Sequence, residues 1–186
     1  EAADIYIVNT CSVTNMAERK SRQMLHRAKK KNPDVVVVAV GCYAQVGKEE
    51  LSKDTNIDLI IGNNKKKDLI HILEEHMGEK ESAAESIEVI DIAHDQEYES
   101  LHVEQLKEHT RAYIKVQDGC NQFCSYCIIP YARGPVRSRA KDDVVREIKE
   151  LAHNGFKEII LVGIHVASYG VDLGNTTLES LIMDVD

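Results

Sequence analysis

The run Val35–Val40, VVVVAV, restricts the possible folds of this chain more than any other feature. It has no polar residue at alternate positions, so a strand formed here must be buried on both faces. Asn32-Pro33 stops the helix that precedes the run, and Gly41 ends the strand. A strand buried on both faces is typical of a parallel sheet covered by helices, so an α/β fold is predicted.

The first 78 residues alternate between strand-like and helix-like segments. Strands are predicted at 4–8, 35–40 and 58–62, and helices at 17–31, at about 46–53 and at about 65–76. Thr14 or Asn15 is the expected N-cap of the first helix. This order predicts a domain over residues 1–78 that has a parallel sheet with right-handed crossovers.

Residues 79–110 interrupt the alternation. Residues 81–110 carry nine acidic residues and one lysine, a net charge of −8, which equals the formal net charge of the whole chain. The acidity therefore belongs to this segment and does not argue against a nucleic-acid partner for the rest. We interpret 79–110 as an acidic, solvated interdomain linker; the alternative is that its apolar residues lay one short strand along another element.

A second α/β pattern covers residues 111–186. Strands are predicted at 111–116, 136–139 and 157–163, and helices at 141–154 and from 178 onward. These strands are too few to close a sheet or barrel. The chain also begins without an initiator Met, so we expect a protein truncated at both ends.

Three cysteines lie within the nine residues GCNQFCSYC, with the spacing C-x3-C-x2-C. Five cysteines in 186 residues are too few for a disulfide framework, and an odd group of three always leaves one thiol over. Thiolates bind zinc and iron–sulfur centres, but structural zinc requires four ligands, and no fourth is local. Cys120, Cys124 and Cys127 are therefore predicted to hold a cubane cluster with one iron open to a chelating molecule.

Cys11 and Cys42 each follow a predicted parallel strand at its carboxyl end. In open α/β sheets this edge is where ligands bind, and neighbouring strands would bring the two thiols to one crevice. The alternative is a pair of buried, unreactive cysteines, because free cysteine is commonly buried.

Four stretches resemble the methylthiotransferases among the radical S-adenosylmethionine enzymes. They are DGCNQFCSYCIIPYARGPVRSR from Asp118, NTCSVTNMAERKSRQ from Asn9, VAVGCYAQ from Val38 and GIHVASYG from Gly163. The second and fourth are most similar to the branch that acts on threonylcarbamoyladenosine in tRNA. The resemblance implies a flavodoxin-like parallel-sheet domain, followed over residues 111–186 by the start of a radical S-adenosylmethionine partial (β/α) barrel.

The resemblance also implies two metal sites. Cys120, Cys124 and Cys127 would hold a 4Fe–4S cluster that binds S-adenosylmethionine and cleaves it reductively to a deoxyadenosyl radical. Cys11 and Cys42 would be two of three ligands of a second 4Fe–4S cluster, which delivers sulfur. The family's third N-terminal cysteine lies upstream of the match to Cys11 and its RNA-binding β-barrel lies downstream, both outside this sequence.

Cofactor contacts and partners follow from the same resemblance. Tyr126 would contact the adenine of S-adenosylmethionine, and Arg133 would bind its carboxylate or RNA phosphate; the alternative for Arg133, Arg137 and Arg139 is a solvated surface run. His165 has an active-site or a structural loop role. The implied partners are the anticodon arm of tRNA and a reductant such as flavodoxin or ferredoxin. No apolar run approaches the roughly 20 residues of a membrane span. Cysteines used as thiolate ligands fit a reducing cytosol better than a disulfide framework does, so a cytoplasmic enzyme is predicted.

Three functions therefore compete. The first is a transferase that adds a methylthio group at carbon 2 of threonylcarbamoyladenosine beside the anticodon. The second is a sibling that acts on isopentenyladenosine or on a ribosomal protein aspartate. The third is a non-catalytic metal or electron-transfer module. Neither a phosphate-binding loop motif nor a dinucleotide-binding glycine motif is present, so nothing supports an NTPase or a nicotinamide enzyme.

Overall fold

The apolar run forms β2 (Val36–Gly41), a central strand of a parallel sheet, in a computed structural model that describes residues 3–78, 86–99 and 110–185. The sheet has the order β1-β2-β3-β4, and every neighbouring pair is parallel. The other strands are β1 (Ile5–Thr10), β3 (Leu59–Ile61) and β4 (Ser86–Glu88). The parallel sheet predicted for the first part of the chain is confirmed.

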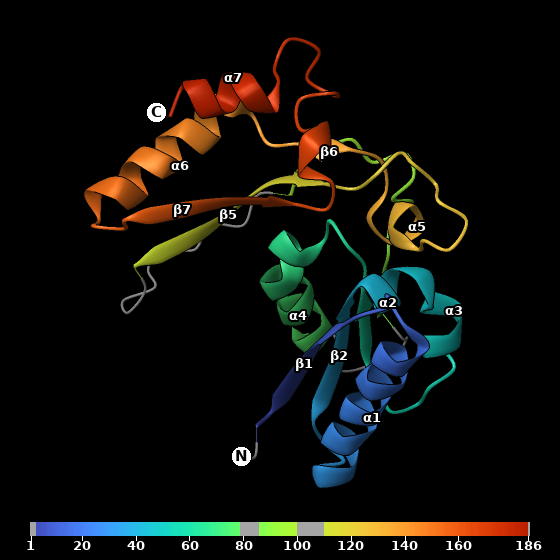
Figure 1. Cartoon of the computed structure of the whole chain (residues 1–186). Helices are drawn as coiled ribbons and strands as arrows, with labels where there is room; N and C mark the ends of the chain where they lie inside the picture. The colour runs from blue at the N-terminus through green and yellow to red at the C-terminus, as the bar shows by residue number, and fades with distance from the viewer. Residues whose placement is uncertain (1–2, 79–85, 100–109, 186) are drawn as a thin grey trace.

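Helices cover both faces of this sheet (Figure 1). One face packs under α1 (Asn15–Lys31), α2 (Cys42–Val46) and α3 (Lys48–Leu51). The other packs against α4 (Leu69–Gly78), which follows the short η1 (Lys66–Asp68). Alternate residues of β2 enter the two cores: Val37 and Ala39 face α1, while Val38 and Val40 face α4. Burial on both faces is the reason that the run has no alternation.

The predicted N-cap of the first helix is confirmed at Thr14, whose hydroxyl accepts a hydrogen bond from the Ala17 amide at 3.1 Å. The helix predicted at 46–53 differs from the structure, because helical turns begin already at Cys42 and are interrupted at Gly47. Tyr43 and Ala44 are buried in the core under α1, so tertiary packing orders a stretch that has little helical signal of its own.

The described part of the expected linker, residues 86–99, is not a solvated connector. Its β4 extends the parallel sheet by pairing Ile87 with Ile60. Ile92 is 4% exposed and Glu99 is 8% exposed, so the segment is anchored beyond the strand as well. The rest of the expected linker, 79–85 and 100–109, lies outside the described residues. The division into domains at residues 78 and 110 stays a prediction.

A second sheet, of order β6-β5-β7, follows. Its central strand β5 (Arg111–Asp118) pairs in parallel with β7 (Glu158–Gly163) and antiparallel with β6 (Arg137–Ser138). One face carries α6 (Lys141–His153), the short η2 (Val166–Ser168) and α7 (Leu178–Met183) around a core with Val116 and Val144. The short helix α5 (Ile129–Arg133), which the sequence did not predict, lies beside α2 (Figure 1). Within the described residues, no helix is long and apolar enough to cross a membrane.

Candidate functional site

The register of β1 and β2 places the two N-terminal cysteines at one edge of the first sheet. Thr10 pairs with Gly41 at the carboxyl ends of these strands, and Cys11 and Cys42 are the next residues. Cys11 is exposed, whereas Cys42 is 7% exposed at the start of α2. The predicted placement at a common sheet edge is confirmed. Their role as metal ligands stays a prediction.

The loop that carries the other three cysteines leaves the carboxyl end of β5. All three thiols are free; Cys124 is exposed, and Cys120 and Cys127 are half-buried. The Cys120 amide donates to the Gly134 carbonyl at 3.1 Å, and the Cys127 amide donates to the Cys124 carbonyl at 2.9 Å. Backbone hydrogen bonds therefore shape the loop and leave the three sulfur atoms available.

The donor set on this loop fits an iron–sulfur cluster, because it offers three accessible thiols and no carboxylate or imidazole competes within the nine residues. Across residues 3–78, 86–99 and 110–185, no three Cys, His, Asp or Glu side chains are gathered as a preformed metal site. Cys120, Cys124 and Cys127 thus share one loop, but their convergence on a metal stays a prediction.

Gly119 permits the turn from β5 into this loop. Its φ is +71°, in the left-handed region, and a Cβ atom there would lie 1.8 Å from the Pro135 carbonyl oxygen. No other residue type fits, because both the backbone conformation and the space exclude a side chain. The glycine before the first cysteine is therefore a requirement of the loop geometry.

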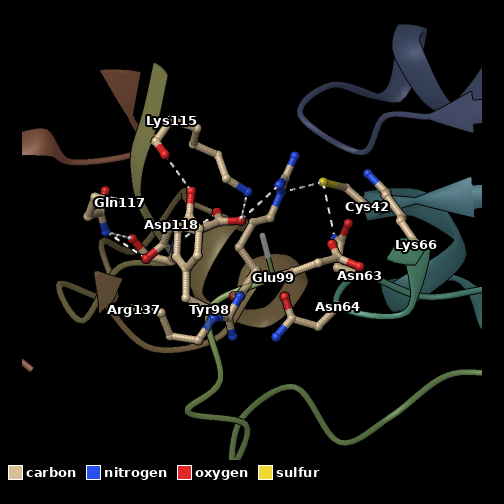
Figure 2. A network of polar contacts seen from close by, with 12 residues as sticks. Cys42, Asn63, Asn64, Lys66, Tyr98, Glu99, Lys115, Gln117, Asp118 and Arg137 are labelled. Atoms are coloured by element: carbon tan, nitrogen blue, oxygen red, sulfur yellow. Dashed lines mark hydrogen bonds and ion pairs between the residues drawn. The ribbon is translucent and has the colours of Figure 1, made fainter. Parts of the chain in front are cut away.

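A buried carboxylate lies at the base of the loop. Asp118 is 4% exposed; its Oδ1 accepts from the Gly119 amide at 2.9 Å, and its Oδ2 lies 3.0 Å from Lys115 Nζ and 3.2 Å from Arg133 Nη1. Burial alone would raise the pKa of Asp118, but the positive charges of Lys115 and Arg133 bring it below its usual value. Asp118 is therefore a fixed negative charge that holds two cations (Figure 2).

Arg133 connects this carboxylate to the first sheet. Its Nε lies 3.1 Å from Cys42 Sγ while its Nη1 contacts Asp118, so the guanidinium lies between the two. Asn63 approaches the same sulfur, with Nδ2 at 3.5 Å, and donates to the Ala132 carbonyl at 2.6 Å. The contact predicted between Arg133 and S-adenosylmethionine or RNA stays a prediction; the structure places its guanidinium against a protein thiol and a carboxylate.

Arg137 and Arg139 do not form the solvated run that was the alternative for these arginines. Arg137 is 1% exposed, and its Nη2 donates to the Arg133 carbonyl at 2.8 Å. Arg139 is 6% exposed and pairs with Glu147 on α6. Each arginine is buried where it can bind a carbonyl or carboxylate of a neighbouring element, so these two side chains join elements of the fold and do not face solvent.

Lys66 brings another cation toward Cys42 (Figure 2). Its ammonium lies 3.4 Å from Asn9 Oδ1 at the end of β1. Burial and the positive charge of Arg133 lower the pKa of Lys66. The carboxyl edge of the first sheet therefore gathers a guanidinium and an ammonium beside a buried cysteine, an arrangement that suits an anionic ligand.

The remaining predicted residues surround the loop. The Tyr126 ring is 90% exposed, and its contact with adenine stays a prediction. His165 is held by β5 and by its own loop: its amide donates to Gln117 Oε1 at 2.8 Å, and its Nδ1 lies 2.5 Å from Ser168 Oγ. Phe123 and Tyr131 pack edge to face, with ring centroids 5.7 Å apart, on a hollow of about 710 Å³.

Reasoning from the sequence missed Asn63, Lys66, Lys115 and Asp118 as members of this site. Asp118 stands two residues before the first cysteine of the motif, which is a signal that could have been used. Asn63 and Lys66 follow the third strand, at the same sheet edge as Cys11 and Cys42, and the rule that ligands bind at this edge applies to them too. Their convergence on Cys42 required the tertiary structure.

Two family matches correspond to the two sheets. Residues 1–62 match the Uncharacterized protein family UPF0004 and include Cys11 and Cys42. Residues 114–179 match the Radical SAM superfamily, beginning within β5 and including the C-x3-C-x2-C loop. The chain is therefore similar to UPF0004 proteins over its first sheet and to radical SAM proteins over its second, where SAM is S-adenosylmethionine.

Similar proteins specify this class further. The chain is 44% identical over 174 residues to the threonylcarbamoyladenosine tRNA methylthiotransferase MtaB of Aquifex aeolicus, which covers 94% of this chain and 42% of the relative. It is 37% identical to the protein of that name from Bacillus subtilis, over 100% of this chain and 41% of the relative. A tRNA-2-methylthio-N(6)-dimethylallyladenosine synthase of Dictyoglomus thermophilum is 38% identical, over 100% of this chain and 42% of the relative.

These matches confirm the predicted resemblance to the radical SAM methylthiotransferases, the threonylcarbamoyladenosine branch included. The chain spans 41–42% of the length of these three relatives. They also confirm the predicted fold class, since a parallel UPF0004 sheet precedes the β-strands of a radical SAM domain.

Proposed function

We propose that this chain is the cluster-binding part of a radical SAM enzyme that adds a methylthio group at carbon 2 of threonylcarbamoyladenosine in tRNA. The observation that supports it most directly is the C-x3-C-x2-C loop at the carboxyl end of β5, inside the stretch that matches the Radical SAM superfamily. The tRNA nucleoside comes from the name of the relative with 44% identity.

The chain's own residues have distinct parts in this proposal. Cys120, Cys124 and Cys127 would bind a 4Fe–4S cluster, which supplies the electron for reductive cleavage of S-adenosylmethionine. Cys11 and Cys42, side by side at the edge of the first sheet, would contribute to a second cluster that supplies sulfur. Tyr126 stands free on the loop to cover a bound cofactor.

The electropositive surroundings of Cys42 support a sulfur-handling role at that edge. A guanidinium lies 3.1 Å from the sulfur and a lysine ammonium is nearby, and such cations can hold an anionic ligand at this edge. The anticodon arm of tRNA, an electron donor such as flavodoxin or ferredoxin, and a cytoplasmic location complete the proposal. Each of these follows from the class of enzyme and not from a contact in the structure.

The decisive experiment is anaerobic reconstitution with iron and sulfide, followed by reduction in the presence of S-adenosylmethionine. Release of deoxyadenosine is expected from the parent protein and not from Cys120→Ala, because that variant leaves the cluster one thiolate short. Cys120→Ala that still cleaves S-adenosylmethionine would contradict the assigned role of the loop. A protein that holds zinc, or a cluster whose spectrum does not respond to S-adenosylmethionine, would support the non-catalytic alternative.

The substrate needs a separate test, because the dimethylallyladenosine synthase of Dictyoglomus thermophilum is 38% identical to the chain. Mass spectrometry of tRNA nucleosides from a deletion strain is expected to show loss of the methylthio-threonylcarbamoyl nucleoside, with the methylthio-isopentenyl nucleoside retained. The opposite pattern would assign the chain to the sibling branch.

A further inference from the structure

The last turn of α5 contacts both cysteine sites through three consecutive residues. The Ala132 carbonyl accepts from Asn63 of the first sheet at 2.6 Å, and the Arg133 guanidinium lies 3.1 Å from Cys42 Sγ. The Gly134 carbonyl accepts from the amide of Cys120, the first cysteine of the loop, at 3.1 Å. Residues 132–134 therefore contact the edge of the first sheet and the start of the C-x3-C-x2-C loop at the same time.

We propose that residues 132–134 are a bridge that positions the cysteine loop against the Cys42 edge of the first sheet, with Arg133 as the positioning residue. The part of this inference that concerns metal rests on the proposed function. The contact itself does not, because it is made between protein atoms.

The Arg133 side chain is fixed in place by an ion pair with Asp118. Asp118 Oδ2 lies 3.2 Å from its Nη1, and Asp118 is itself held by the Gly119 amide and by Lys115. The guanidinium therefore contacts the fixed Asp118 carboxylate through Nη1 and the Cys42 sulfur through Nε. A planar cation held by Asp118 loses little freedom when it contacts the Cys42 sulfur, so it is suited to orient that sulfur.

The residues on either side of Arg133 are also buried against the first half of the chain. Ala132 is completely buried, and Asn63 is 3% exposed. Gly134 has φ +72°, and a Cβ atom at this position would lie 2.2 Å from the carbonyl oxygen of Ile92, in the segment that follows β4. The turn thus packs closely on the first half of the chain, as a bridge requires.

A sulfur that ligates iron still accepts hydrogen bonds, and such bonds from outside the ligand set tune the site and stabilise it. Arg133 would then serve the N-terminal metal site from the radical SAM half of the chain. The N-terminal site would be complete only when the two halves are docked, and the bridge would keep a constant relation between the two cysteine sites.

The contact is tested first without metal, by hydrogen–deuterium exchange of the apoprotein. Loss of one hydrogen bond to a charged group lowers the stability of the docked turn, so Cys42→Ala and Arg133→Met are each expected to speed exchange within 119–134 by about tenfold. Cys11→Ala is the matched control, because Cys11 is the other predicted N-terminal ligand and, among the described residues, its side chain has no hydrogen bond to Arg133. It is expected to leave exchange in that stretch unchanged.

The double variant Cys42→Ala with Arg133→Met is expected to speed exchange by less than the two single effects combined, because both variants remove the contact between Arg133 and Cys42. Equal effects of Cys42→Ala and Cys11→Ala, or additive effects in the double variant, would overturn the bridge. Arg133→Lys keeps a cation and is expected to restore part of the protection.

The second measurement uses protein that also carries the upstream third cysteine implied by the family resemblance. Its iron–sulfur clusters are assembled anaerobically in a background where Cys120, Cys124 and Cys127 are replaced by Ala. Arg133→Met is expected to lose iron to a chelator about tenfold faster than its parent, as when an outer hydrogen-bond partner is removed. Arg133→Lys should slow the loss, and Arg146→Met, at an exposed arginine of α6, should not change it. Equal rates for the Met variants at 133 and 146 would overturn the metal-positioning role. A background that takes up no iron would contradict the second cluster of the proposed function, while the exchange experiment still decides the bridge.

Discussion

Asn63 donates from Nδ2 to the carbonyl oxygen of Ala132 at 2.6 Å, across 69 positions of the sequence. Asn63 follows the short strand β3, and Ala132 belongs to α5 beyond the cysteine loop. Both residues are buried, so water cannot replace this hydrogen bond if it is lost. It is one of the contacts by which the two halves of the chain hold each other.

Asn63→Ala should therefore destabilise the protein by about 1–3 kcal/mol, because it leaves the buried Ala132 carbonyl without this donor. Asn175→Ala, at an exposed asparagine, is the matched control and should change the free energy of unfolding by less than about 0.5 kcal/mol. Urea unfolding of the two variants and the parent measures both values. Equal stabilities of the two variants would show that the contact between the halves contributes nothing to the fold.

Gly119 and Gly155 both have a left-handed backbone, but only Gly119 is crowded by other atoms. Alanine substitutions at the two positions therefore distinguish the cost of backbone strain from the cost of a steric clash. Gly119→Ala places a Cβ atom 1.8 Å from the Pro135 carbonyl, whereas Gly155, with φ +92°, has no atom within 4 Å of such a Cβ. Gly155→Ala should cost only the backbone strain, about 1 kcal/mol. Gly119→Ala should cost clearly more, because the loop start must move. Thermal unfolding should rank the variants in this order; a Gly119→Ala protein as stable as Gly155→Ala would contradict the close approach.

The pair His26 and Asp54 predicts a pH dependence of stability. Burial alone would raise the pKa of Asp54, but hydrogen bonds from His26 and Asn56 bring it below its usual value. A carboxylate with a depressed pKa in the folded state adds stability above its unfolded pKa, near 3.9, and that stability is lost as the pH falls through the folded value.

Asp54→Asn should accordingly be less stable than the parent at pH 7 and at pH 5, and the difference should shrink below about pH 4. Free energies of unfolding in urea from pH 7 to pH 3 measure the difference. Asp34→Asn, at an exposed aspartate beside the same sheet, serves as the control. A difference that stays constant down to pH 3 would contradict the inferred shift at Asp54.

Separate roles of the two cysteine sites predict separable activities. The test uses protein extended by the upstream cysteine and the downstream RNA-binding β-barrel that the family resemblance implies. In it, Cys11→Ala should retain reductive cleavage of S-adenosylmethionine, because the C-x3-C-x2-C loop is intact, and should lose methylthio transfer to tRNA. Deoxyadenosine release and tRNA nucleoside analysis measure the two activities on one sample. Cys124→Ala should lose both. A Cys11→Ala enzyme that still transfers the methylthio group would exclude Cys11 from the sulfur-supplying site.

Local patterns were sufficient for the elements whose burial is uniform along their length. The apolar run became β2, and helix α6 matched its predicted extent to within one residue because one of its faces is continuously apolar. Local patterns did not predict the helices of short segments that are ordered by packing against neighbouring elements. Residues 129–133 are helical although they contain Pro130, and residues 42–45 continue directly from a strand into a helix. Neither segment is long enough to form a helix alone.

The same division holds for the site. The three loop cysteines were predicted as ligands from their spacing within nine residues, and that role stays a prediction. Cys11 and Cys42 were placed together by the rule that parallel strands end at a common edge, and the register of β1 and β2 agrees with it. Arg133 was expected to contact a cofactor or RNA, because it follows the cysteine motif in the sequence. Its position in the sequence does not indicate that Cys42 and Asp118 are its partners in the fold.

The amino-acid sequence by itself determined the buried strands, the helices with one apolar face and the spacing of the thiols. These are properties of residues near one another along the chain, where periodicity and ligand spacing act directly. Only the tertiary structure decided that Arg133 lies between Asp118 and Cys42, 91 positions away from that cysteine. A charged side chain is buried only where a partner is available, and the partner's position depends on how two sheets dock, which no local pattern records.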